Sequence, residues 1–137
     1  MSKAPQVGVG VIVKRGNKVL LGKRKTAHGK GTWQLCGGHL NFNEKAETCA
    51  KREAFEEAGI RIKNIKHLTF TEDLFRKEGK HYITLFLVAD YASGKVRNME
   101  PNILEEWKWF EWSKLPKPLF KPIQNLLKKG HNPFKLR

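Results

Sequence analysis

The stretch Gly38–Ile60, which reads GHLNFNEKAETCAKREAFEEAGI, decides both the fold and the chemistry of this chain. Small side chains recur in it at four-residue steps, at Ala46, Ala50, Ala54 and Ala58. In a helix this spacing makes one narrow stripe that can lie close against a sheet. We therefore predict a helix that runs from an N-cap at Asn43 to Ala58, with Gly59 directly after its end.

Three glutamates share one face of this predicted helix. Glu53, Glu56 and Glu57 occupy positions i, i+3 and i+4, so their carboxylates project within about one turn. Carboxylates this close repel one another unless a cation neutralises them, and oxygen ligands suit magnesium or manganese. Arg52 can pair with Glu56, and Glu44 is expected in the first turn. A solvated face whose acids pair with nearby lysines is the alternative that the glutamates alone leave open.

The order and spacing of these residues resemble the Nudix box, the metal-binding motif of the Nudix hydrolase family. Gly38 is followed by five residues and Glu44, then by seven residues and the segment Arg52–Ile60. This matches G-x5-E-x7-R-E-U-x-E-E-x-G-U at every fixed position, with Ala54 and Ile60 as the apolar residues. The pattern specifies seven residues and two apolar positions within 23, so the match is highly specific.

The resemblance continues outside the box, in the segments Gly8–Lys25, Gln34–Leu35, Gly37–Leu40 and Asn132–Lys135. These segments are similar to the nucleotide-diphosphatase branch of the family, which includes MutT-like sanitising enzymes. They also resemble enzymes that cleave purine or thiopurine nucleoside triphosphates to monophosphates. The implied fold class is α/β (α+β), a Nudix fold in which a mixed β-sheet lies between helices as an α/β/α sandwich.

The same resemblance implies a divalent-metal site, with magnesium as the cofactor and manganese as a substitute. Glu53, Glu57 and the Gly37 carbonyl would ligate the metal, Glu56 would assist, and Arg52 would orient Glu56. The metal would polarise phosphoryl oxygens and activate a water to attack phosphorus. Glu56, Glu57 and Arg52 are therefore the candidate catalytic residues.

The residue that takes the proton from the attacking water differs between family members. Glu56 and Glu57 rank first in this chain. Glu105 and Glu106 remain alternatives, because they could approach from the loop before Trp107. The five histidines show no metal-ligand spacing.

For the nucleotide, the resemblance implies a binding site that contains Gln34, Leu35, Gly38, Thr84, Arg24 and Phe120. Arg24 is expected near the phosphates, and Gln34, Leu35, Thr84 and Phe120 near the base. Ordinary core packing is the alternative for Leu35, Thr84 and Phe120, and simple exposure is the alternative for Arg24. A buried hydroxyl at Thr84 would need a hydrogen-bonding partner.

Hydrophobic patterns predict the remaining elements. We expect strands over residues 9–13, 19–21, 33–35, 60–74, 82–89 and 107–112, with a turn at Glu78–Gly79 and a terminal amphipathic helix over about 119–129. Pro122 restricts that helix to beginning near it. The tryptophans at 107, 109 and 112 could stack on a base, but indoles at strand spacing favour the core. The length suits one domain over residues 1–137.

Composition narrows the partners and the compartment. The net charge of +14 attracts polyanions, which favours nucleotides or nucleic acid, with solvated lysines as the alternative. The longest apolar run, residues 83–89, is far below the roughly 20 residues of a membrane span, so no membrane partner is expected. Met1–Gln6 lacks the apolar region of a secretory signal, and Cys36 and Cys49 suggest reduced thiols. We expect a cytoplasmic protein.

The leading hypothesis is a magnesium-dependent pyrophosphohydrolase that converts nucleoside tri- or diphosphates, including oxidised or modified ones, to nucleoside monophosphate plus pyrophosphate or phosphate. One alternative is a hydrolase of capped RNA 5′ ends, which the positive charge supports. Another is a catalytically silent module that binds nucleotide or RNA, against which the complete set of Glu53, Glu56 and Glu57 argues. The preferred base, the released product and a homodimeric state are left open by the sequence.

Overall fold

A seven-stranded sheet forms the centre of the molecule in the computed structural model, which describes residues 3–136. Its strands are β1 (Gln6–Arg15), β2 (Lys18–Arg24), β3 (Trp33–Gln34), β4 (Cys36–His39), β5 (Arg61–Phe75), β6 (Lys80–Ser93) and β7 (Leu104–Glu111). The main path runs β3-β2-β1-β6-β5, while β4 pairs with β1 and β7 pairs with β2. β1 and β6 are parallel and the other pairs are antiparallel, so the sheet is mixed.

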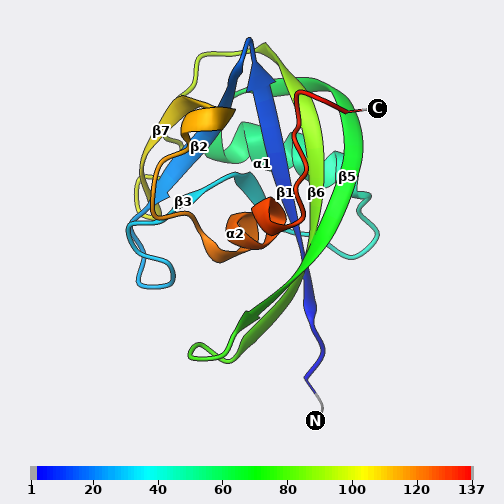
Figure 1. The fold of residues 1–137 in the computed structure, drawn as a ribbon, viewed down its shortest axis with the longest axis vertical. Helices are drawn as coiled ribbons and strands as arrows, with labels where there is room; N and C mark the ends of the chain where they lie inside the picture. The colour runs from blue at the N-terminus through cyan, green and yellow to red at the C-terminus, as the bar shows by residue number, and fades with distance from the viewer. Residues whose placement is uncertain (1–2, 137) are drawn as a thin grey trace.

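Two hairpins account for most of the sheet. The predicted strands over residues 9–13 and 19–21 are present and form a hairpin, with β1 and β2 joined at Gly16, whose φ of 61° favours glycine. The predicted turn at Glu78–Gly79 is confirmed, β5 differs from the predicted strand by one residue at each end, and β6 extends further along the chain than the hydrophobic pattern indicated. Their far ends project away from the body of the sheet beside the N-terminus (Figure 1).

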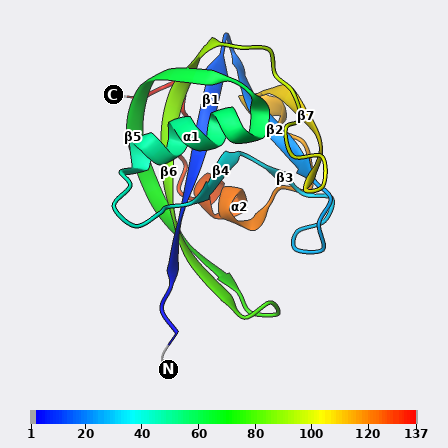
Figure 2. The ribbon, with the colours of Figure 1, turned by 180° about the vertical axis from the view of Figure 1, so that it is seen from behind.

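One helix covers each face of the sheet. α1 (Ala46–Ala58) lies across one face and α2 (Lys121–Lys128) lies on the other, as Figures 1 and 2 show from opposite sides. The predicted stripe of small residues is buried, because Ala50, Ala54 and Ala58 are fully inaccessible against the sheet. The buried residues form two hydrophobic clusters, and Ile123 and Leu126 of α2 pack into the one that does not contain the α1 alanines. The expected α/β/α arrangement around a mixed sheet is confirmed.

The start of α1 differs from the prediction. Asn43 is not the N-cap, because its φ of 65° is left-handed and the chain turns there. The helix begins three residues later, at Ala46, after an extended Lys45. Glu44 therefore lies ahead of the helix and not within its first turn. The predicted end is correct, since Gly59 adopts a φ of 70° directly after Ala58.

Side chains of α2 and its C-cap reach the free edge of the sheet. β5 is the last strand of the main path, so carbonyl groups along its outer edge have no neighbouring strand. Lys121 donates to the Leu74 carbonyl, and Lys129 donates to the Phe70 carbonyl. Between them, the Asn125 amide donates weakly to the Glu72 carbonyl at 3.4 Å. The spacing matches, because four helical residues and two strand residues each span about 6 to 7 Å.

Two further expectations concern the cysteines and the membrane. Cys36 and Cys49 are both free and buried, and burial raises the pKa of the Cys49 thiol to about 12. No helix within residues 3–136 is long and apolar enough to cross a membrane. Residues 1, 2 and 137 lie outside the described part of the chain, and so does the beginning of the polar segment Met1–Gln6.

Candidate active site

The carboxylate of Glu57 is fixed against the backbone of β4. Glu57 is 6% exposed, and its Oε1 accepts a hydrogen bond of 2.7 Å from the Gly37 N–H. The backbone carbonyl of Glu57 in turn accepts a bond of 3.1 Å from the Trp107 Nε1–H. The last turn of α1 is thereby held between β4 and β7. A tryptophan of the sheet, which sequence reasoning treated only as core or base-stacking, positions an acid of the site.

Two glycines allow the close approach of strand and helix. A Cβ on Gly37 would lie 1.9 Å from the Val9 carbonyl oxygen, inside any allowed contact. A Cβ on Gly38 would lie 2.7 Å from Cδ of Glu53. The first glycine is therefore required by the pairing of β4 with β1, and the second by the Glu53 carboxylate. Gly37 is thus needed for the sheet, and Gly38 is needed for the acidic site on α1.

Arg52 joins three carboxylates. It donates to Glu44 through Nε at 2.8 Å and through Nη2 at 3.0 Å, and it contacts Glu53 at 2.6 Å. Its contact with Glu56 is longer, at 3.3 Å. The expected pairing with Glu56 is present, but Glu44 and Glu53 are the closer partners. The Arg52 bonds, joined by a bond from the Asn41 N–H, lower the pKa of Glu44 to about 2.

Electrostatics distinguish two of the acids on α1. Burial raises the pKa of Glu57 well above its usual range, and the charges of Glu53 and Glu100 add to this effect. Burial also raises the pKa of Glu53, against the opposing effect of Arg52. Buried carboxylates of this kind are stabilised in their charged form by a nearby cation. The arrangement therefore favours a positive ion between the helix and β4.

The donor set fits a hard divalent cation. Gly38 lacks the side chain that would fill the space in front of the Glu53 carboxylate, and the groups around this space offer oxygen ligands. Within residues 3–136, however, no three acidic, histidine or cysteine side chains already converge as a metal site. Arg52 holds Glu53 at 2.6 Å, so metal binding would require that carboxylate to turn from the arginine.

The loop before β7 contributes a different acid from those expected. Glu105 contacts Lys23 at 3.7 Å and Glu106 contacts Lys108 at 3.5 Å, so both are engaged with lysines. Glu100 is the loop residue whose charge raises the pKa of both Glu53 and Glu57. Sequence reasoning identified the correct loop but missed this residue, because nothing in the local pattern distinguishes it from its acidic neighbours.

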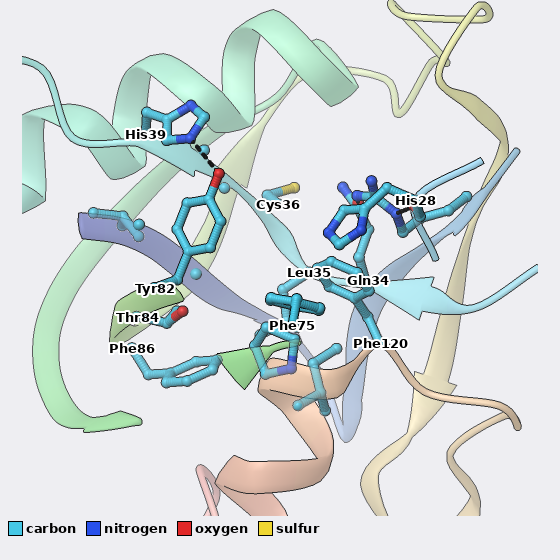
Figure 3. A pocket seen from close by; sticks show the side chains of 18 of the residues that line it. His28, Gln34, Leu35, Cys36, His39, Phe75, Tyr82, Thr84, Phe86 and Phe120 are labelled. Carbon is cyan, nitrogen blue, oxygen red and sulfur yellow. Dashed lines mark hydrogen bonds between the residues drawn. The ribbon is translucent and has the colours of Figure 1, made fainter. Parts of the chain in front are cut away.

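A pocket of about 290 Å³ opens beside the same two glycines. All six residues predicted to bind the nucleotide line it, namely Arg24, Gln34, Leu35, Gly38, Thr84 and Phe120. Figure 3 labels Gln34, Leu35, Thr84 and Phe120 among them. Their roles toward a ligand stay predictions. Gly37 and Gly38 belong both to the pocket lining and to the strand that contacts α1, so the pocket and the acidic cluster are adjacent.

Arg24 supports one wall of this pocket. Its guanidinium lies 4.3 Å from the centre of the Phe120 ring and donates to the Gln34 Oε1 and to the His28 carbonyl. Burial lowers its pKa, while the Glu57 charge acts in the opposite direction. These contacts place Arg24 with the side chains expected near a base. Its expected position near phosphates is a separate prediction.

Several pocket residues were not identified from the sequence. His28 and Phe75 pack edge to face with ring centres 4.6 Å apart, and Phe75 stacks on Phe120 at 5.6 Å. Tyr82 forms the opposite rim, where its hydroxyl meets the His39 imidazole at 2.8 Å (Figure 3). These aromatic residues come from a loop and two strands, so no sequence window contains them together.

The partner of the Thr84 hydroxyl was also missed. Asp73 is fully buried, and its Oδ2 accepts a bond of 2.5 Å from Thr84. Thr71, Asp73 and Phe75 alternate as the buried residues at the end of β5. An acid at an inward strand position was the available signal. The three tryptophans at 107, 109 and 112, by contrast, do not line the pocket in the described part of the chain and pack against the cores as favoured.

A mixed sheet between two helices, with a glutamate-rich helix fixed to a glycine-rich strand, defines the class as a Nudix-type α+β domain. Comparison with known proteins agrees. Residues 4–129 match the NUDIX domain family, and the chain therefore belongs to the Nudix hydrolases. A MutT NUDIX hydrolase from Burkholderia pseudomallei is similar in structure, with a TM-score of 0.81 and 34% identity, over 85% of this chain and 91% of that one.

Other relatives are larger proteins. The NAD-capped RNA hydrolase NudC of Edwardsiella ictaluri is 31% identical over 114 residues, which cover 82% of this chain and 42% of the relative. A MutT/nudix family protein from Enterococcus faecalis has a TM-score of 0.70 and 27% identity, over 80% of this chain and 45% of that one. The chain thus spans less than half the length of the curated relatives it matches.

Proposed function

We propose that this Nudix hydrolase is a magnesium-dependent pyrophosphohydrolase of nucleoside tri- or diphosphates, with nucleoside monophosphate as one product. The observation that carries the proposal is the double role of the Gly37–Gly38 backbone. On one side it contacts the buried carboxylate of Glu57, and on the other it lines the aromatic pocket. A nucleotide whose base lies in that pocket would extend its phosphates toward the acids of α1.

The residues of the chain supply positioning and charge. Glu53 and Glu57 would hold the divalent cation with the Gly37 carbonyl, and Glu56 would assist. A cation there polarises phosphoryl oxygens and lowers the pKa of a bound water. Arg52 keeps the carboxylates of Glu44 and Glu53 in place. Glu56 and Glu57 are the proposed proton acceptors, and the charge of Glu100 near Glu57 makes it a third.

The test measures release of pyrophosphate and phosphate from a panel of nucleotides, including oxidised and methylated bases. The protein is assayed with magnesium, with chelator, and as Glu57→Gln. Turnover that requires the metal and is lost in the variant would support the proposal and rank the bases. A folded, metal-binding protein that turns over no nucleotide would overturn it. Glu47→Gln is the matched control, because Glu47 lies on α1 outside the acidic cluster and its carboxylate contacts His67 at 3.4 Å.

A second candidate function is hydrolysis of capped RNA 5′ ends. The observation that favours it is the 31% identity to the NAD-capped RNA hydrolase, together with the net charge of +14. Lys80 at the start of β6 lines the pocket, and Arg76 and Lys77 lie in the turn between the lining residues Phe75 and Lys80. A flexible RNA chain leaving the pocket would meet these cations. This activity would use the same acids as the first.

Salt dependence separates the two substrates. Capped RNA contacts several cations, so its kcat/KM should fall steeply between low and physiological salt, whereas a free nucleotide held through metal should change less. We expect Lys77→Ala together with Arg76→Ala to reduce turnover of capped RNA and to leave turnover of free nucleotides unchanged. If capped RNA is not cleaved at any salt concentration, the second candidate is excluded.

A further inference from the structure

A buried carboxylate that the proposed chemistry does not use contacts the pocket-lining residue Thr84. Asp73 is fully buried, remote from the acids of α1 in sequence, and accepts hydrogen bonds from three side chains. Its Oδ2 accepts from the hydroxyls of Thr71 at 3.2 Å and Thr84 at 2.5 Å, and its Oδ1 accepts from the Asn125 amide at 2.9 Å. Of these donors, Thr84 lines the pocket.

The carboxylate decides which way the Thr84 hydroxyl bonds. A threonine hydroxyl has one hydrogen to donate and two lone pairs to accept with. Thr84 donates its single hydrogen to Asp73 Oδ2, so this hydrogen is not available to a ligand. What Thr84 presents to the pocket is therefore a lone pair. Without the Asp73 carboxylate, the same hydroxyl could rotate and serve as a donor or an acceptor.

A similar constraint acts on the opposite wall. Gln34 is 7% exposed, and its Oε1 accepts from the Arg24 guanidinium, which is itself fixed over Phe120. The amide nitrogen, which can only donate, is what remains for a ligand. Figure 3 shows Thr84 near Tyr82 and Phe86 on one side of the pocket, and Gln34 near Phe120 on the other. The pocket thus has fixed polarity, with an acceptor on one side and a donor on the other.

We propose that Asp73 is a positioning residue that makes Thr84 an obligatory hydrogen-bond acceptor, so that the pocket selects bases with an exocyclic amino donor at that edge. Adenine, guanine and their derivatives that keep this amino group belong to this class. Bases without such a hydrogen would leave a buried acceptor unpaired, which is the costly case. This inference rests on the proposed nucleotide function and concerns how the same site chooses its base.

The test compares nucleotides that differ by one amine. Adenosine triphosphate is paired with purine riboside triphosphate, and guanosine triphosphate with inosine triphosphate. In at least one pair, we expect the wild type to favour the amine-bearing nucleotide by about 10-fold in kcat/KM, through KM, as one hydrogen bond allows. Thr84→Val keeps the shape and should bring that ratio close to one, whereas Thr84→Ser should retain it.

The positioning role of Asp73 needs a measurement that a purely structural role would not change. The ratio of kcat/KM within each nucleotide pair provides this measurement. In Asp73→Ala the hydroxyl of Thr84 is free to rotate, so the ratio should fall to a value between that of the wild type and one, and adding Thr84→Val should bring it close to one. Asp73→Asn should restore the ratio, because its oxygen can face the two threonines. A structural defect would lower kcat/KM for both nucleotides of a pair equally and would leave their ratio unchanged. If Asp73→Ala fails to fold, which melting temperature reports, the comparison of Thr84→Val with Thr84→Ser decides.

Binding of the monophosphates keeps this inference separate from the proposed activity. Calorimetry with the adenosine, purine riboside, guanosine and inosine monophosphates measures the pocket without any hydrolysis. A preference for the amine-bearing member that Thr84→Val removes would sustain the inference even if no triphosphate were hydrolysed. A ratio that is one in both wild-type pairs, or that Thr84→Val leaves unchanged, would overturn it whatever the protein hydrolyses.

Discussion

The acidic face of α1 and the pocket beside it are assembled in opposite ways. The acids and Arg52 lie within one helix and the segment just before it, and a single strand, β4, completes the arrangement. The residues that line the pocket come from a loop, six different strands, the approach to α2 and the first turn of α2. The first region depends on local spacing, and the second depends on long-range pairing. Substitutions in the two regions should therefore affect different kinetic quantities.

The largest effect is expected at the buried acid. Glu57→Gln keeps the shape and can still accept from the Gly37 N–H, but it removes the charge that would hold a cation. We expect kcat to fall by about 100- to 1,000-fold, the range seen when one electrostatic contact to a transition state is lost. Affinity for the nucleoside monophosphate should change little. Comparable losses of kcat and of product affinity would contradict the separation of the two regions.

The two glycines of β4 give a sharper version of the comparison. Gly38→Ala places a Cβ 2.7 Å from the Glu53 carboxylate, which must move, while the backbone can remain. We expect kcat to fall by about 10- to 100-fold, as for a disturbed metal environment, with a nearly unchanged melting temperature. Gly37→Ala instead meets the Val9 carbonyl at 1.9 Å, so it should destabilise the sheet. Equal melting temperatures in the two variants would disprove this division.

In the pocket, Phe120→Ala should act on binding. The ring stacks on Phe75 and contacts Arg24, and its loss removes an aromatic surface that a base would use. We expect KM to rise by about 10-fold with kcat nearly unchanged, since a lost stacking contact is worth about 1 kcal/mol. Leu127→Ala on α2 serves as the control, because this side chain is 36% exposed. A fall in kcat without a change in KM would show that Phe120 acts on the chemistry.

The smallest effect concerns acid stability. The pKa of Glu44 is lowered in the folded protein from 4.5 to about 2 by Arg52 and the Asn41 N–H. The charged carboxylate thus favours folding above pH 4.5, and this contribution is lost as the pH falls toward 2. In Glu44→Gln, the melting temperature should depend less on pH in that window than in the wild type. Parallel curves for the two proteins would show that the pairing with Arg52 adds no stability.

The success of the sequence-based predictions also differs between the region that depends on local spacing and the region that depends on long-range pairing. Glu53, Glu56 and Glu57 could be placed on one face from helical spacing alone, and the Gly59 end was correct because a glycine there has a local cause. The start of the helix was wrong because Asn43 has two possible uses, as a cap or in a left-handed turn. Only the geometry of the chain between β4 and α1 decides between them.

Long-range contacts limit how much of the pocket can be predicted from the sequence. Thr84 was expected to need a partner, but Asp73 is brought to it by the pairing of β5 with β6, whose register no local pattern encodes. His28 lies in a glycine-rich loop, and nothing near it in sequence indicates its packing against Phe75. Resemblance supplied the six residues that do line the pocket. Physical reasoning on the sequence alone left core packing as an alternative for Leu35, Thr84 and Phe120, and simple exposure as an alternative for Arg24.

The side chains that reach β5 from α2 make the helix a substitute for a missing strand. Lys121, Asn125 and Lys129 donate to alternate carbonyls of β5, as the backbone of a neighbouring strand would. A second chain that added itself at this edge would first have to displace them. Asn125 also donates to Asp73, which accepts from the pocket residue Thr84, so the residue that helps close the sheet is connected to the pocket. Protection from edge-to-edge association and the shape of the pocket thus depend on the same helix.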